Sequence, residues 1–345
     1  MYKYRLTVFT PTYNRGYIIE NLYNSLKDQT FKDFEWVVID DGSTDNTEEL
    51  FKVWINEKND FSIKYIKRKN GGKHRAINQG VEIAQGELFF IVDSDDKLIN
   101  KALEIIDIQE MSIPKEKKKE FAGVCGNKGY TEKDIIGSTF DNEILDITML
   151  EREKNGIYGD KAEVFYTDIL KRYKFPEFEG ENFITECVVW DRIAYDKYKL
   201  RFFNKIIYIG DYLEDGLTKQ GNQVFKNNPK GYALFLTQRA KYDRLSLKKR
   251  VNKYEQYYSL LNKDLTLMDM AKNLNTTLLI ITWIDIKFKY INIITEMCRY
   301  KDYYIKNERN MNISDIASQL EISVIYLRLI LMTSRLRNNI KNILN

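Results

Sequence analysis

A short apolar run that ends in three carboxylates constrains this chain more than any other stretch. Residues 89–92, Phe-Phe-Ile-Val, are followed by Asp93, Ser94, Asp95 and Asp96. Four apolar residues between polar ones predict a strand buried on both faces, with the acids at its carboxyl end, where open α/β sheets bind ligands. Three carboxylates this close repel one another unless a cation such as Mg²⁺ or Mn²⁺ compensates them. A surface turn rich in aspartate is the alternative.

The first hundred residues alternate between strand and helix patterns, at a spacing typical of a doubly wound α/β fold with right-handed crossovers. The predicted strands cover residues 4–9, 35–39, 63–66 and 88–92. The predicted helices cover residues 18–29, 46–54 and 73–84. We therefore expect a mostly parallel sheet with helices on both faces.

Polar loops follow the first, second and fourth predicted strands, whose ends meet at one edge of the sheet. The loops are 10–15, 40–45 and 93–96. Their convergence favours a nucleotide crevice, although the chain has neither a GxGxxG sequence after the first strand nor a Walker A sequence. Residues 71–75, Gly-Gly-Lys-His-Arg, let the backbone approach a ligand and place positive charge at a helix start, which suits phosphate. A solvated basic loop is the alternative there.

The composition is that of an ordinary globular protein. The chain has 345 residues, 43% of them hydrophobic and 30% charged, and its net charge of +4 does not by itself indicate nucleic acid. Its three cysteines are far apart, so the sequence predicts neither a disulfide framework nor a zinc site and fits a reducing compartment. Since no signal-peptide pattern and no apolar stretch of membrane-spanning length is visible, we expect a cytoplasmic protein.

Five motifs in the first hundred residues resemble, in order and spacing, those of glycosyltransferase family 2. They are TPTYNR at 10–15, VIDDGSTD at 38–45, NGGKHRAIN at 70–78, AQGE at 84–87 and VDSDD at 92–96. The resemblance implies the GT-A fold and transfer of a sugar with inversion of configuration, of the kind used in bacterial surface-polysaccharide synthesis. It also implies a nucleotide-sugar donor, with UDP as the expected nucleotide, and Mn²⁺ or Mg²⁺ as cofactor.

The same resemblance implies roles for individual residues. Three residues after the first strand would line the nucleoside pocket, namely Pro11, Thr12 and Arg15. Asp41 would accept a hydrogen bond from the uracil ring, and Lys73 would lie near the base or the diphosphate. Asp93 would face the ribose, while Asp95, with Asp96 close by, would hold the metal on the diphosphate.

An inverting transfer needs a carboxylate on the acceptor side to take the proton of the attacking hydroxyl. Members of the family commonly supply it as an acid at the start of a helix that follows a loop. Glu186 fits best as this general base, because it lies between an aromatic-rich loop and an apolar helical pattern. Glu181 is the reserve candidate, and Asp191 is expected on the exposed face of the helix. A glutamate that merely complements the helix dipole is the alternative for Glu186.

The glycine-poor final third predicts a helical appendage. We expect a catalytic domain over 1–230, with a nucleotide-binding half 1–100 and an acceptor-side half 101–230, followed by a helical C-terminal extension over 231–345. In residues 325–345, basic and apolar side chains alternate without an acid. Such a helix can lie on an anionic membrane, here the inner face of the cell membrane, or pack against protein.

The sequence therefore predicts a metal-dependent inverting glycosyltransferase that uses a UDP-sugar and acts on a cell-surface glycan or a lipid-linked acceptor. A nucleotidyltransferase of similar fold and a sugar-nucleotide-binding relative without activity are the alternatives. Residues 312–323 also resemble the start of a helix-turn-helix. Their turn lacks glycine and the following helix is too apolar to read DNA, so no nucleic acid is expected. A homo-oligomer stays open.

Overall fold

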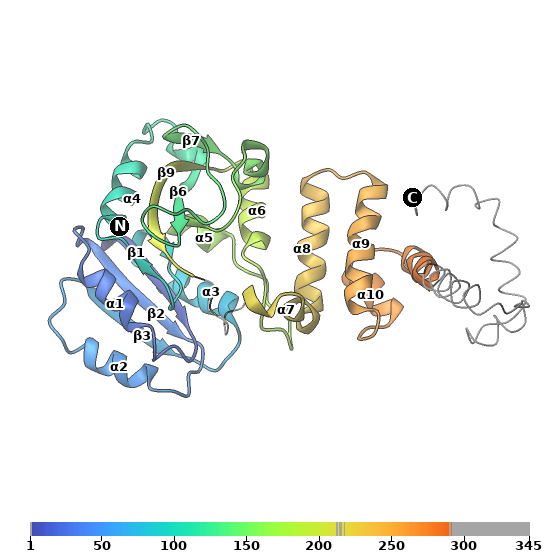
Figure 1. The fold of residues 1–345 in the computed structure, drawn as a ribbon, viewed down its shortest axis with the longest axis horizontal. Helices are drawn as coiled ribbons and strands as arrows, with labels where there is room; N and C mark the ends of the chain where they lie inside the picture. The colour runs from blue at the N-terminus through green and yellow to red at the C-terminus, as the bar shows by residue number, and fades with distance from the viewer. Residues whose placement is uncertain (1, 212, 214–215, 217, 290, 292–345) are drawn as a thin grey trace, which may run out of the picture. The chain divides into compact units, whose positions relative to one another are not determined.

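The chain divides into two compact units, residues 1–253 and 254–345. The computed structural model describes residues 2–211, 213, 216, 218–289 and 291. The first unit contains a nine-stranded sheet, and the described part of the second is helical (Figure 1). The predicted catalytic domain over 1–230 lies within the first unit, and its boundary stays a prediction.

The first hundred residues form the parallel half of the sheet. Its strands are β1 (Tyr4–Thr12), β2 (Phe34–Asp40), β3 (Ser62–Lys67) and β4 (Gly86–Ile91). The helices between them are α1 (Glu20–Lys27), α2 (Thr47–Trp54) and α3 (Lys73–Ile83). Val8 of β1 lies opposite Trp36 of β2 and Phe90 of β4, with parallel pairing on both sides. The apolar periodicity predicted every one of these elements to within three residues at either end.

The second half of the sheet is mixed. Its strands are β5 (Lys97–Leu98), β6 (Phe121–Gly129), β7 (Ile144–Ile147), β8 (Lys161–Tyr166) and β9 (Lys199–Ile209). The helices among them are α4 (Ala102–Met111), α5 (Thr167–Arg172) and α6 (Cys187–Tyr195), with short 3-10 turns at Lys118–Glu120, Met149–Glu151 and Glu153–Asn155. The strand order is β3-β2-β1-β4-β8-β6-β9-β5, with β7 paired to β9. Only β5, β7 and β8 run opposite to the other six strands of the sheet, because each pairs antiparallel with its neighbours. The sheet is therefore mixed but mostly parallel, as predicted.

Helices cover both faces of this sheet, which confirms the predicted α/β class (Figure 1). Successive side chains of a strand point to opposite faces, so Val8 and Trp36 face one core while Phe9 and Val37 face the other. The first core is closed by apolar side chains of α1, α2 and α4. The second is closed by those of α3, α5 and α6.

Helices follow the sheet from residue 222 onward. They are α7 (Asn222–Asn227), α8 (Pro229–Tyr242), α9 (Leu247–Leu261) and α10 (Leu267–Asn273), and residues 278–289 are also helical. In the second unit, the Tyr258 hydroxyl donates to Asp285 at 2.6 Å. No helix among the described residues is long and apolar enough to cross a membrane. The segments 312–323 and 325–345, for which sequence patterns were noted, lie outside the described residues.

The close approach of α3 to β1 gives a test of the second core. A Cβ added at Gly80 would lie 2.1 Å from Cε2 of Phe9, which is fully buried and stacked on Phe89 at 5.1 Å between ring centroids. We expect Gly80→Ala to lower the free energy of unfolding by about 1–2 kcal/mol, because overpacking costs more than the roughly 1 kcal/mol gained in helix propensity. Urea denaturation would measure it.

Glu82→Ala is the matched control, since Glu82 lies on the same helix and makes only an exposed ion pair with Lys174 at 3.0 Å. Such a pair is worth at most about 1 kcal/mol. A Gly80→Ala protein as stable as the wild type would show that α3 does not pack on β1 at this distance.

Candidate active site

The loops after β1, β2 and β4 meet at the carboxyl edge of the sheet and enclose a cavity of about 690 Å³. This volume is in the range of small-molecule sites. All eight residues predicted for the donor and the metal line this cavity, namely Pro11, Thr12, Arg15, Asp41, Lys73, Asp93, Asp95 and Asp96. The cavity also has lining residues that the sequence did not single out, Lys128 and Asn228 among them.

Side chains of the second motif hold the first two loops together. Asn14, in a left-handed conformation with φ of 51°, donates its backbone N–H to the Ser43 hydroxyl at 2.8 Å. Its side-chain oxygen accepts the backbone N–H of Thr44 at 2.8 Å. The Asp45 carboxylate accepts the backbone N–H of Gly16 at 2.9 Å. These residues therefore shape the cavity wall by fixing loop conformation.

Asp41 binds the glycine loop that precedes α3. Its carboxylate accepts the backbone N–H groups of Gly71 at 3.0 Å and Gly72 at 2.6 Å, and Arg68 Nε lies 3.3 Å away. Gly72 has a φ of +97°, which side-chain-bearing residues rarely adopt, so glycine is required there. Asp41 therefore holds the loop that begins α3 in place while its own side chain lines the cavity.

Two lysines compensate the acidic cluster after β4. Lys73 Nζ lies 2.7 Å from Asp93 Oδ1, and Lys128 Nζ lies 2.8 Å from Asp96 Oδ2. Burial alone would raise the pKa of Asp93, but Lys73 and Lys128 outweigh it and hold that pKa below its ordinary value. Burial raises the pKa of Asp96 to about 6 despite Lys128.

Asp95 is the member of this cluster without an ion pair to any described residue. Burial, and then the charge of Asp93, raises the pKa of its carboxyl. The described residues hold no cluster of three or more protein ligands for a metal. However, Mg²⁺ is commonly held by one or two carboxylates plus substrate phosphates. The open carboxylate of Asp95 and the buried, unpartnered Oδ1 of Asp96 fit that kind of site.

Lys73 also contacts the predicted base, since its Nζ lies 2.9 Å from Glu186 Oε1. Glu186 is the residue at the N-cap of α6, but its side chain makes no capping hydrogen bond. Its carboxylate therefore faces a cation of the cavity instead of serving the helix. Burial alone would lower the pKa of Lys73, but Asp93 and Glu186 outweigh it and raise that pKa.

Glu181, the reserve candidate, has a different environment. Its two carboxylate oxygens accept the backbone N–H groups of Lys230 at 2.7 Å and Gly231 at 2.8 Å, in the first turn of α8. Asn228, just before α8, accepts the backbone N–H groups of Asn182 at 2.8 Å and Phe183 at 3.0 Å. The loop that carries Glu181 is thus tied to the start of α8.

Asp191 is buried, so its predicted position on an exposed helix face is wrong. It accepts two hydrogen bonds from Arg239 of α8, at 3.0 and 3.1 Å. The local sequence pattern marks the face of α6 that carries Asp191 as polar, and hence as exposed. In the structure, α8 packs against α6 and covers this face.

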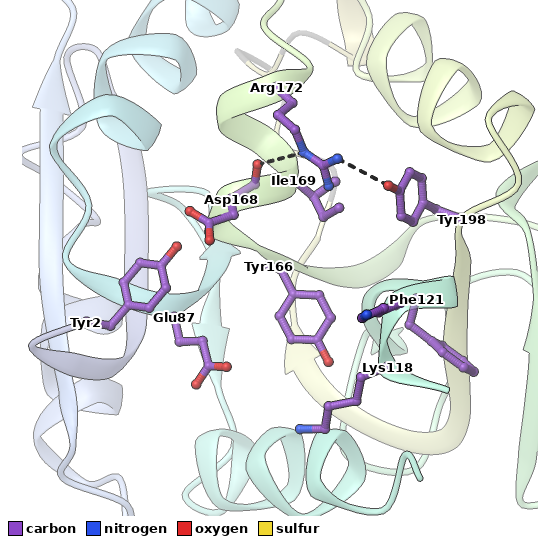
Figure 2. Close-up of a pocket in the computed structure, with 10 residues that line it drawn as sticks. Tyr2, Glu87, Lys118, Phe121, Tyr166, Asp168, Ile169, Arg172 and Tyr198 are labelled. Carbon is purple, nitrogen blue, oxygen red and sulfur yellow. Dashed lines mark hydrogen bonds between the residues drawn. The ribbon is translucent and has the colours of Figure 1, made fainter. Parts of the chain in front are cut away.

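A second cavity, of about 390 Å³, lies at the opposite edge of the sheet, near the start of β4 (Figure 2). Arg172 donates to the backbone oxygen of Asp168 at 3.3 Å and to the Tyr198 hydroxyl at 3.2 Å, the two dashed lines of Figure 2. Two of its other charged groups, Glu87 and Lys118, form ion pairs with Arg5 and Glu110. Because the residues predicted for the donor and the metal line the first cavity and not this one, the cavity with the acidic cluster is the candidate active site.

The fold and this cavity define a GT-A domain with an acidic motif at the end of β4. A crystal structure of Staphylococcus aureus TarS 1–349 in complex with UDP-GlcNAc has the same fold, with a TM-score of 0.52 and 19% identity over 74% of this chain and 81% of that one. Residues 7–106 match the model of glycosyltransferase family 2. The chain is a glycosyltransferase with a family 2 domain over residues 7–106.

Two relatives align beyond the family motifs. Glycosyltransferase GlyG of Streptococcus pneumoniae is 29% identical over 218 residues, which are 60% of this chain and 69% of that protein. The GalNAc(5)-diNAcBac-PP-undecaprenol beta-1,3-glucosyltransferase of Campylobacter jejuni is 28% identical over 200 residues, 56% of this chain and 60% of that protein. The chain thus covers under two thirds of the length of the second relative.

The stability of the protein tests the structural role of Glu181. We expect Glu181→Ala to lower the free energy of unfolding by about 1–2 kcal/mol, because it removes the acceptor of two backbone N–H groups in the first turn of α8. Thermal or urea denaturation would measure the loss. Glu179→Ala, at an exposed position of the same loop, should be within about 0.5 kcal/mol of the wild type. Equal stability of both variants would contradict the structural role of Glu181.

Proposed function

We propose that the chain transfers a sugar from UDP to a hydroxyl of a cell-surface glycan or lipid-linked acceptor, with inversion at the anomeric carbon. The observation that carries this proposal is that Lys73 contacts both Asp93 and Glu186, which joins the predicted donor side to the predicted base. The names of the Campylobacter relative and of TarS, a poly(ribitol-phosphate) β-N-acetylglucosaminyltransferase, support surface glycans as the acceptor class.

The nucleoside would bind between the first two loops and the glycine loop. Thr12 Oγ1 is buried in the cavity wall with no partner among the described residues, so it can hydrogen-bond the donor without breaking a contact. Arg15 adds positive charge to the same wall, and Asp41 would accept the uracil N–H. Asp93, already held by Lys73, would accept a ribose hydroxyl.

Asp95, with Asp96, would hold Mn²⁺ or Mg²⁺ against the diphosphate. A bound divalent ion acts as a Lewis acid that stabilises the negative charge of the leaving nucleoside diphosphate. Lys128 fixes Asp96 by an ion pair at 2.8 Å and leaves Oδ1 of that carboxylate free among the described residues. The protein thereby presents two carboxylates at one end of the cavity in a defined orientation.

Glu186 would take the proton of the acceptor hydroxyl as that oxygen attacks the anomeric carbon from the face opposite the leaving diphosphate. Its Oε1 lies 2.9 Å from Lys73, and Oε2 would be the atom that accepts the proton. Glu181 cannot serve in this way without releasing the N–H groups of α8, so Glu186 is our candidate for the base.

The membership in family 2 favours sugar transfer over nucleotidyl transfer. Contact with the inner face of the membrane through 325–345 remains part of the proposal, on the sequence pattern alone. A variant of that segment without its basic side chains would bind anionic lipid more weakly.

The metal role of Asp95 is tested by calorimetry with UDP. In the wild type, we expect Mn²⁺ to raise the affinity for UDP at least about tenfold over chelator, because the ion links the carboxylate to the diphosphate. In Asp95→Ala, Mn²⁺ should bring no gain. Asp141→Ala, an exposed loop variant, should behave as the wild type. Equal UDP affinity of the wild type in Mn²⁺ and in chelator would exclude the metal from donor binding.

The base is tested by Glu186→Gln, which keeps the size of the side chain and removes its basicity. We expect kcat for sugar transfer to fall by about 10²–10⁴-fold, the usual contribution of a general base, while UDP affinity changes little. UDP release from a panel of UDP-sugars, with glycan acceptors, would measure the rate. Glu179→Gln is the control. Full activity of Glu186→Gln would mean that another group removes the proton.

A further inference from the structure

A single ammonium group lies between the donor and acceptor sides of the cavity. Lys73 Nζ is 2.7 Å from Asp93 Oδ1, after β4, and 2.9 Å from Glu186 Oε1, at the start of α6. The side chains of all three residues are only a quarter to a third exposed, at 25%, 35% and 34%. In such a partly desolvated setting, a charge-assisted contact orients both partners more strongly than it does at an open surface.

The backbone around Lys73 packs directly against the loop that carries the base. A Cβ at Gly72 would lie 1.7 Å from the carbonyl oxygen of Asn182, so the two backbones touch. Arg75, in the first turn of α3, donates to the carbonyl oxygens of Glu181 at 2.6 Å and Phe178 at 2.8 Å. The position of Lys73 relative to Glu186 is therefore set by several contacts besides its own ion pair.

The same backbone segment is held from the donor side. Asp41 accepts the N–H groups of Gly71 and Gly72, immediately before Lys73. An unbroken series of contacts thus runs from Asp41 through the glycine loop and Lys73 to Glu186. A ligand that contacts Asp41 or Asp93 acts on residues that hold Lys73, and Lys73 in turn holds Glu186.

We propose that Lys73 is a positioning residue for the base, which orients the Glu186 carboxylate into the cavity and couples its geometry to occupancy of the donor site. This rests on the proposed function, in which Glu186 is the base and Asp93 faces the ribose. With Oε1 held by Lys73, Oε2 would receive the acceptor proton. The competing role, contact with the donor alone, predicts an effect of Lys73 that does not depend on Glu186.

A double-mutant cycle separates these two roles. The variants are Lys73→Met, Glu186→Gln and the pair, with kcat for UDP release from UDP-GlcNAc and the calorimetric Kd for UDP measured for each. We expect Lys73→Met to lower kcat by about 10²-fold in the wild-type background and by less than about threefold in the Glu186→Gln background, because residues that act as a unit are not additive. Lys73→Arg, which keeps the charge, should recover most of the lost kcat.

Crystal structures of the variants give a readout that needs no turnover. We expect the Glu186 carboxylate to keep its orientation in Lys73→Arg and to lose it in Lys73→Met. Lys73→Gln replaces Lys73→Met if the latter does not fold. Lys67→Met, which breaks a more exposed lysine ion pair with Glu48 at 2.9 Å, is the control for loss of a lysine and should alter neither kcat nor Glu186.

An unchanged Glu186 in Lys73→Met, or an equal loss of kcat in both backgrounds, would overturn the positioning role and leave Lys73 as a donor contact. Full activity of Glu186→Gln would instead overturn the assignment of the base, whatever Lys73 does. Absence of UDP binding by the wild type would overturn the proposed function itself. The three failures are therefore distinguishable.

Discussion

The balance of buried charge at the carboxyl end of β4 is the constraint on which the rest of the site depends. Asp93, Asp95 and Asp96 lie within four positions of the sequence, and burial penalises each charge that has no partner. Lys73 and Lys128 compensate two of them from separate elements, α3 and β6. Asp95 forms no ion pair with a described residue. Burial and the charge of Asp93 raise the pKa of its carboxyl and outweigh Arg15 and Lys128, which act to lower it. A further cation beside Asp95 would therefore stabilise this carboxylate, at the place where we propose that the diphosphate lies.

The parallel half of the fold, and the residues at its edge, could be predicted because the signals are local. Buried parallel strands are continuous apolar runs, and their carboxyl ends must meet at one edge, so the loops after β1, β2 and β4 were expected to converge. Lys128 could not be predicted in the same way. It reaches Asp96 because β6 joins the sheet beyond the antiparallel β8, and no short pattern encodes that strand order.

The acceptor side shows why acidic residues cannot be assigned from sequence alone. Glu181, Glu186 and Asp191 are similar in a linear reading, yet each faces a different partner. Backbone N–H groups of α8 hold the first, Lys73 contacts the second, and Arg239 of α8 pairs with the third. Only the packing of distant segments, such as α8 against α6, separates a structural carboxylate from one that contacts a lysine of the cavity.

A base carried by a loop poses a physical problem that Lys73 addresses. A free glutamate side chain has several rotamers, and fixing it in one costs up to about 2 kcal/mol of conformational entropy. An ion pair that already orients the side chain reduces the part of this cost that acceptor binding must offset. Full pairing would oppose catalysis, because a carboxylate held by an ammonium group is harder to protonate. Lys73 is shared between Asp93 and Glu186, so neither carboxylate receives its whole charge. A donor that draws Asp93 toward its ribose would change that division, and with it the environment of the base, at the moment when transfer becomes possible.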